Sequence, residues 1–148
     1  MKVILISCAA IKDETVIGGR TVPAKDLYQS DLFKKAWTYA NQMKAPDDKI
    51  YILSAKHHLL NPDQHIGWYN DTLNTMKVAQ RQEWANVVLD QLKNEQVDLM
   101  NDQFVFLAGK NYFEKLLPAL NIDNCIFPYK GCPGIGYILQ FLKKELTH

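Results

Sequence analysis

Apolar residues in this chain gather in four short runs, and each run ends at a small or polar motif. The runs occupy residues 2–6, 49–53, 104–107 and 125–127. Each run is largely continuous instead of alternating with polar positions, which is typical of strands that are covered on both faces of a parallel sheet. We therefore expect helices on both sides of such a sheet.

Between and after these runs, apolar residues recur at three- and four-residue spacing, which predicts amphipathic helices. The predicted helices begin after Ser30, a suitable N-cap, and end near Lys44, and then cover residues 73–94, 111–120 and 133–146. Strands and helices thus alternate along the chain. This order predicts an α/β fold, a three-layer αβα sandwich with a mostly parallel sheet of about four strands.

Length, charge and apolar content narrow the class of protein. A chain of 148 residues is expected to form one α/β domain over residues 1–148. Because 17 Lys and Arg residues balance 16 Asp and Glu residues, no global field favours nucleic acid or an anionic membrane, although a local basic patch stays open. The apolar runs fall well short of the roughly 20 residues of a membrane span, and the start shows no secretory cleavage site. We expect a cytoplasmic protein without a membrane partner.

Cysteine and histidine spacing gives little support to a disulfide or metal site. Cys8, Cys125 and Cys132 form no CxxC pair and are odd in number, so free thiols are expected. A metal site would have to use the set His57, His58, Asp63 and His65. Their spacing matches no standard ligand pattern, so no metal and no cofactor are expected.

Parallel strands release their loops at one edge of a sheet, so the four loops that follow the runs are expected to meet in one crevice. Two of the connections, residues 9–29 and 56–72, are too long for simple turns, which is typical of functional loops. An active site at this edge is therefore the leading hypothesis.

The first loop offers Ser7, Cys8, Asp26 and Tyr28. Cys8 is either a nucleophile, with His57 as its base, or a small residue packed at a strand end, which is the commoner case. Asp26 and Tyr28 precede a helix, where they suit a substrate hydroxyl or a base edge. Capping by Asp26 and plain packing by Tyr28 are the alternative.

The second loop begins with Ser54, Lys56 and His57 and holds the densest set of ionisable groups. Lys56 suits a phosphate or carboxylate, and a desolvated lysine there would also be able to attack a sugar C1′ as an amine. His57 can transfer protons near neutral pH.

Trp68, Tyr69, Asn70 and Asp71 follow later in the same loop. An aromatic ring stacks on a nucleobase, an amide pairs with its edge, and a carboxylate orients water or stabilises an oxocarbenium-like sugar. Helix capping by Asp71 and core packing by Trp68 are the alternative reading.

Glycines mark the last two loops. Gly109, just before Tyr112, predicts a close approach of the backbone to a partner. Gly131, Gly134 and Gly136 precede or open a helix, where free N–H groups attract anions, although they would also allow tight helix packing. The spacing matches neither a Walker sequence nor a dinucleotide fingerprint.

Several motifs together resemble an uncharacterised family of small bacterial and phage domains. They are Ser-Cys at residue 7, Pro-Ala-x-x-Leu-Tyr from 23, Leu-Ser-Ala-Lys-His-x-Leu-Leu from 53, Leu-Ala-Gly-x-x-Tyr from 107 and Gly-x-x-Gly-Ile-Gly from 131. In outline the chain is also similar to the YaaA peroxide-stress proteins and to domains attached to tRNA-guanine transglycosylases. The family pattern carries Asp after the tyrosine, where this chain has Asn70 and then Asp71.

The resemblance implies nucleobase chemistry, with N-glycosidic cleavage or base exchange as the expected activity. Asp71, or Asn70 through a water, would support the water or the cationic sugar, with a nucleobase, nucleotide or nucleic acid as partner. A non-catalytic nucleotide-binding module is the alternative, and a hydrolase using Cys8 with His57 is a third reading. The residues do not predict which base is bound or the oligomeric state.

Overall fold

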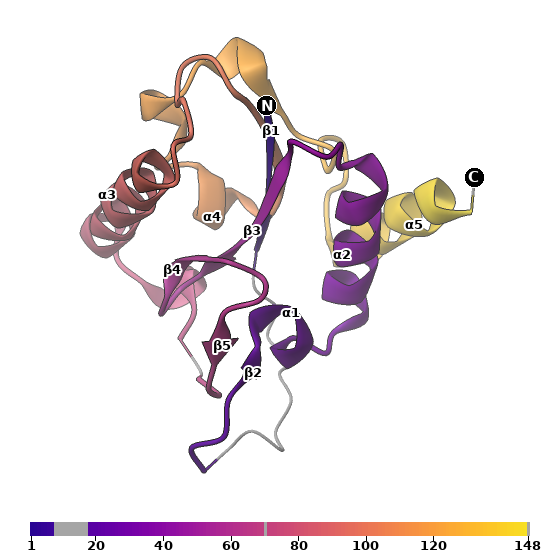
Figure 1. Ribbon diagram of the computed structural model, residues 1–148. Coiled ribbons are helices and arrows are strands. Elements are labelled where there is room, and N and C mark those ends of the chain that lie inside the picture. The colour runs from indigo at the N-terminus through magenta and orange to yellow at the C-terminus, as the bar shows by residue number, and fades with distance from the viewer. Residues whose placement is uncertain (8–17, 70, 148) are drawn as a thin grey trace.

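A five-stranded, mostly parallel sheet forms the centre of the protein in the computed structural model, which describes residues 1–7, 18–69 and 71–147 (Figure 1). The strand order is β4-β3-β1-β6-β7. The strands are β1 (Lys2–Ser7), β3 (Lys49–Ser54), β4 (His58–Leu60), β6 (Gln103–Leu107) and β7 (Cys125–Ile126). Parallel pairing joins β1 to β3 and to β6, and β6 to β7, whereas β4 runs antiparallel to β3. The four predicted strands are therefore confirmed, and β4 adds a fifth.

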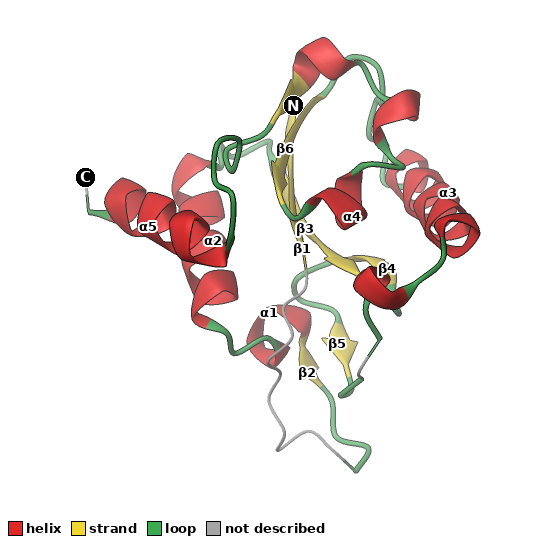
Figure 2. Cartoon of the chain, turned by 180° about the vertical axis from the view of Figure 1, so that it is seen from behind, coloured by secondary structure: helices red, strands yellow, loops and turns green. Residues whose placement is uncertain are grey.

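Helices cover both faces of this sheet, as the continuous apolar runs predicted. They are α1 (Ala24–Leu27), α2 (Asp31–Met43), α3 (Val78–Asn94), α4 (Lys110–Phe113) and α5 (Ile135–Leu146). In Figures 1 and 2, α3 and α4 lie on one side of the sheet, and α2 and α5 lie on the other. The result is the expected α/β sandwich.

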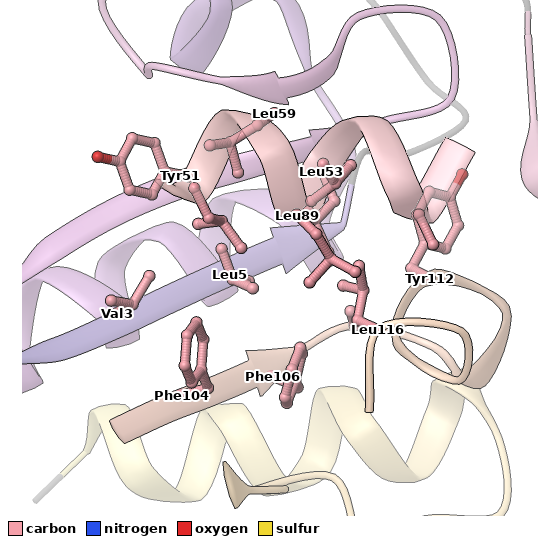
Figure 3. Packing of buried hydrophobic residues seen from close by; sticks show 14 of the residues in the cluster. Val3, Leu5, Tyr51, Leu53, Leu59, Leu89, Phe104, Phe106, Tyr112 and Leu116 are labelled. Atoms are coloured by element: carbon pink, nitrogen blue, oxygen red, sulfur yellow. The ribbon is translucent and has the colours of Figure 1, made fainter. Parts of the chain in front are cut away.

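Side chains alternate between two buried clusters because successive residues of a strand point to opposite faces. Val3 and Leu5 of β1 pack toward α3 and α4, together with Phe104 and Phe106 of β6 (Figure 3). Ile4 on the same strand joins the second cluster, which α2 and α5 cover. Both faces of the sheet are thus apolar, which explains why its strands read as continuous runs.

A small second sheet lies beyond the main one. It pairs β2 (Val22–Pro23) with β5 (His65–Ile66) in antiparallel register. Backbone bonds from Ala24 N to Gln64 O, 2.8 Å, and from Lys25 N to Pro62 O, 3.0 Å, tie α1 to the connection between β4 and β5. These bonds hold the segment before α2 against the segment after β3.

Two predicted helices are shorter than their periodicity indicated. Residues 73–94 form a 3₁₀ turn, Leu73–Thr75, and then α3, because Met76 and Lys77 are extended. The Thr72 side chain accepts a hydrogen bond from Asn74 N at the start of the turn, and the Gln80 side chain accepts one from Lys77 N at the start of α3. The 3₁₀ turn and α3 therefore begin separately, where the sequence predicted one helix. Residues 111–120 likewise break into α4 and the turn Leu117–Ala119, which contains Pro118. Within the described residues, no helix has the length and apolar character needed to cross a membrane.

Candidate active site at the carboxyl edge of the sheet

Ser54, the last residue of β3, is the anchor of a polar cluster at the carboxyl edge of the sheet. Its side chain is fully buried, with 0% exposure. The hydroxyl donates to the Tyr69 hydroxyl at 2.9 Å and accepts from the backbone N–H of His57 at 3.0 Å. The Trp84 indole N–H donates to the Ser54 carbonyl at 2.8 Å. Three segments of the chain are therefore fixed around one serine.

Two buried tyrosines extend this cluster toward α1. The hydroxyls of Tyr28 and Tyr69 lie 2.6 Å apart, and the two residues are 1% and 3% exposed. Their rings meet edge to face at 6.4 Å, and Tyr28 also packs on Phe33 at 5.0 Å. We call Ser54, Tyr69 and Tyr28 the tyrosine-serine network. A buried hydroxyl needs a partner, and each of these hydroxyls has one within the network.

The turn after β3 brings His57 to this network. The chain reverses from β3 into β4 through residues 55–57, and His58 takes a positive φ of 65°, which is uncommon for a residue other than glycine. The His57 ring then meets the Tyr69 ring edge to face at 5.4 Å and 85°. The predicted proton-transfer residue therefore lies directly against the buried tyrosine.

Opposing charges act on His57. Partial burial lowers the pKa of His57 below its ordinary value of 6.5, and the Lys56 ammonium lowers it further, whereas the Asp71 carboxylate raises it. Burial is the largest of these causes. Since the net pKa lies below 6.5, the imidazole is mostly neutral at pH 7 and able to accept a proton. Lys56 and Asp71 are both exposed.

Trp68 and Tyr69, adjacent in the sequence, differ in their exposure. Trp68 is 38% exposed, whereas Tyr69 is buried within the tyrosine-serine network. Of these two residues, only Trp68 therefore offers an accessible ring for a base, whereas Tyr69 contacts Ser54 and His57.

The third loop joins the second at this edge. The Asn111 side-chain amide donates to the Asn74 side-chain oxygen at 2.9 Å. The Tyr112 ring meets the Trp84 ring edge to face at 5.9 Å, and so it is linked to Ser54 through Trp84. Apart from its two neighbours in the chain, no described residue lies within 4 Å of the position that a Cβ would take at Gly109, so the described residues do not make the predicted close approach.

The strand that precedes the fourth loop, β7, is not adjacent to β3. β7 ends opposite Val105, two residues before β6 ends at Leu107. It is also three places from β3 in the sheet, which is roughly 14 Å at ordinary strand spacing. Gly131 has a positive φ of 86°, which a turn before α5 requires, and Gly134 and Gly136 are exposed with nothing within 4 Å of a built Cβ. Tight packing therefore does not account for these glycines.

The first loop contributes at both of its ends. Ser7 ends β1 and pairs with Leu53, so it lies beside the end of β3 that carries Ser54. Asp26 lies exposed on α1, two residues before Tyr28. Cys8 and Asn70 lie outside the described residues.

Metal-ligating side chains do not gather at this edge. Within residues 1–7, 18–69 and 71–147, no three His, Cys, Asp or Glu residues lie close enough to share an ion. Asp63, one member of the set considered from the sequence, forms an ion pair with Lys25 at 2.9 Å. Cys125 and Cys132 are free thiols.

Trp84 is the principal residue that the sequence did not reveal as part of this site. Its helical spacing indicated only core packing, and its ring is indeed buried at the α3 face of the sheet. The indole N–H, a buried donor that needs an acceptor, was the available signal. Its acceptor is the Ser54 carbonyl.

The fold and the cluster together define an α/β protein with an ionisable site where parallel strands end. The chain belongs to a family of unknown function (DUF6884), whose family model matches residues 3–144. No curated protein matches the chain. The predicted membership of an uncharacterised family is thus confirmed, whereas these comparisons do not show the likeness to the YaaA proteins or to transglycosylase-attached domains, which stays a prediction.

Proposed function

We propose that this protein cleaves or exchanges an N-glycosidic bond in a nucleic acid or nucleoside. The observation that carries the proposal is the contact of the His57 ring with Tyr69 of the tyrosine-serine network, where the charges of both Lys56 and Asp71 act on the His57 pKa. Hydrolysis at a sugar C1′ uses a base that activates water and a carboxylate that stabilises a positive sugar, and a lysine nearby can bind a phosphate.

The residues take separate roles in this reaction. A neutral His57 accepts a proton from water while the water oxygen bonds to C1′ and the bond from C1′ to the base nitrogen breaks. The bonding electron pair leaves with the base, which then takes the proton from the His57 imidazolium. Asp71 stabilises the positive charge that develops on the sugar in the transition state. For base exchange, an incoming base takes the place of water.

Substrate contacts come from exposed groups around this centre. Trp68 stacks on the base that leaves, since its ring is 38% exposed. Lys56 is exposed beside His57 and binds a phosphate as a point charge. The tyrosine-serine network positions His57 through the bond from its backbone N–H to the Ser54 hydroxyl.

A panel of labelled single-stranded DNA, RNA and free nucleosides tests the proposal, with released base and the new sugar hydroxyl both quantified. We expect base release from at least one substrate class, or label exchange when free base is added. A non-catalytic binding module would instead give saturable binding without turnover, and its affinity would survive Asp71→Asn. No released or exchanged base on any substrate would overturn the proposal.

A further inference from the structure

A groove lies along the end of α1 and the first two turns of α2. Its volume is about 310 Å³, and Tyr28 forms part of its lining. Small-molecule sites typically occupy about 300–1,000 Å³. The groove therefore has room for one small ligand.

Two aromatic rings form one wall of this groove. Phe33 and Trp37 are one helical turn apart, and their rings stack with centroids 6.5 Å apart and planes 12° apart. Phe33 is only 2% exposed and packs on Tyr28, so it fixes the half-buried Trp37 beside it. An indole ring held in place in this way suits a nucleobase, which presents a π face that can stack on it.

Charged groups line the same groove, and two of them form no ion pair with another described residue. Lys25 is paired with Asp63. Lys34 and Asp26 also line the groove, and neither forms an ion pair in the described part of the chain. An ammonium binds phosphate, and a carboxylate accepts hydrogen bonds from sugar hydroxyls.

We propose that this groove binds one nucleotide, with its base against Trp37, its phosphate at Lys34 and its sugar hydroxyls at Asp26. Tyr28 lines the groove and is hydrogen-bonded to Tyr69, so the groove adjoins the network that supports His57. When the substrate is a nucleic-acid strand, the groove holds a nucleotide near the nucleotide that reacts. This role in substrate binding rests on the proposed function, whereas the binding of a free nucleotide does not.

Calorimetric titration with AMP, adenosine and ribose 5-phosphate tests each contact separately. We expect the wild-type protein to bind AMP more tightly than either fragment. Trp37→Leu, which keeps an apolar side chain, should weaken AMP and adenosine by about fivefold or more, the lower end of a stacking contribution. Lys34→Gln should weaken AMP and ribose 5-phosphate and leave adenosine unchanged.

Lys35→Gln is the matched control. Lys35 is adjacent in sequence, is paired with Asp31 at 2.6 Å and does not line the groove, so this variant should bind AMP as the wild type does. Equal affinity of the wild type for AMP and ribose 5-phosphate would overturn the proposal, as would AMP binding that Lys34→Gln leaves unchanged. Lys34 is exposed, so its substitution tests the groove even if Trp37→Leu fails to fold.

The two proposals fail in different ways. If AMP binding depends on Trp37 and Lys34 but no substrate releases a base, the result supports the nucleotide site and contradicts the proposed function. If the protein releases a base but does not bind AMP, the result supports the proposed function and contradicts the nucleotide site in the groove.

Discussion

His57 is the residue whose chemistry depends most directly on its neighbours. Burial, Lys56 and His58 all lower its pKa, and Asp71 alone among the identified causes raises it. The sequence placed these ionisable groups in one loop, and their mutual influence follows from that proximity. The direction of the net shift required the structure, because it depends on how deeply the turn after β3 buries the ring.

Substitution of either charged neighbour should move the His57 pKa in opposite directions. Lys56→Gln removes a cation and raises the pKa, whereas Asp71→Asn removes an anion and lowers it. Titration of the His57 ring protons by NMR measures both shifts, with Asp90→Asn on the exposed side of α3 as the control. Shifts of the same sign in the two variants would contradict this account of the site.

Ser54 should contribute to stability as well as to the site. Ser54→Ala leaves the His57 N–H without its described acceptor and removes one of the partners of the buried Tyr69 hydroxyl, so we expect a loss of about 1–3 kcal/mol in the free energy of unfolding. Urea denaturation measures the loss. Thr147→Ala removes an exposed hydroxyl bond to the Lys144 carbonyl and should change stability by less than about 0.5 kcal/mol. Equal effects of the two substitutions would show that the network is not structural.

At the scale of elements, the long apolar strands and α2 were predictable because each has a strong pattern and clear ends. Ser30 caps α2 as expected, with its side chain accepting from Phe33 N at 3.1 Å. The divided start of α3 and the break at Pro118 were not predicted, since helical spacing continues across both interruptions. The short strands β2, β4 and β5 have only two or three residues each, too few for a period to show.

The cap of α2 gives a prediction of its own. Ser30→Ala should lower the free energy of unfolding by about 1 kcal/mol, because the Phe33 N–H loses its acceptor. Thr38→Ala in the middle of the same helix is the control, since Thr38 is exposed and its hydroxyl donates to the Lys34 carbonyl one turn earlier. Thermal melting of both variants provides the comparison, and an effect of Ser30→Ala no larger than the control would contradict the assigned cap.

For the molecule as a whole, strand order decides which loops form the site. Parallel strands predicted a shared edge, and the first three loops do meet around Ser54 through Ser7, His57 and Tyr112. The order of the strands in the sheet cannot be read from one sequence, so the position of β7, three places from β3, was not predicted. The inward position of Tyr69 likewise depends on a partner, Tyr28, that is 41 positions away in the sequence.

The stability of the whole protein should fall on mild acidification. Burial is the largest cause that lowers the pKa values of both His57 and His58 below 6.5 in the folded state. The unfolded chain therefore binds more protons between those lowered pKa values and about 6.5, so stability rises with pH in this window and levels off above it.

Urea midpoints measured from pH 5 to 8 test this dependence. The His57→Gln/His58→Asn double variant should flatten the curve near pH 6, since neither new side chain titrates and Asn tolerates the positive φ of residue 58. His65→Gln, at an exposed position, is the control. A wild-type midpoint that rises as the pH falls from 7 to 5 would contradict the directions of both shifts.

The most direct test of the central claim is the rate of base release by the wild type, Asp71→Asn and Asp90→Asn on the substrate that the panel identifies. The account predicts that Asp71→Asn lowers kcat/KM by about 100-fold or more, the scale of a positioned catalytic group. Asp90→Asn, an exposed carboxylate on α3, should leave the rate unchanged. Equal rates for all three proteins, or no base release by the wild type, would contradict the account.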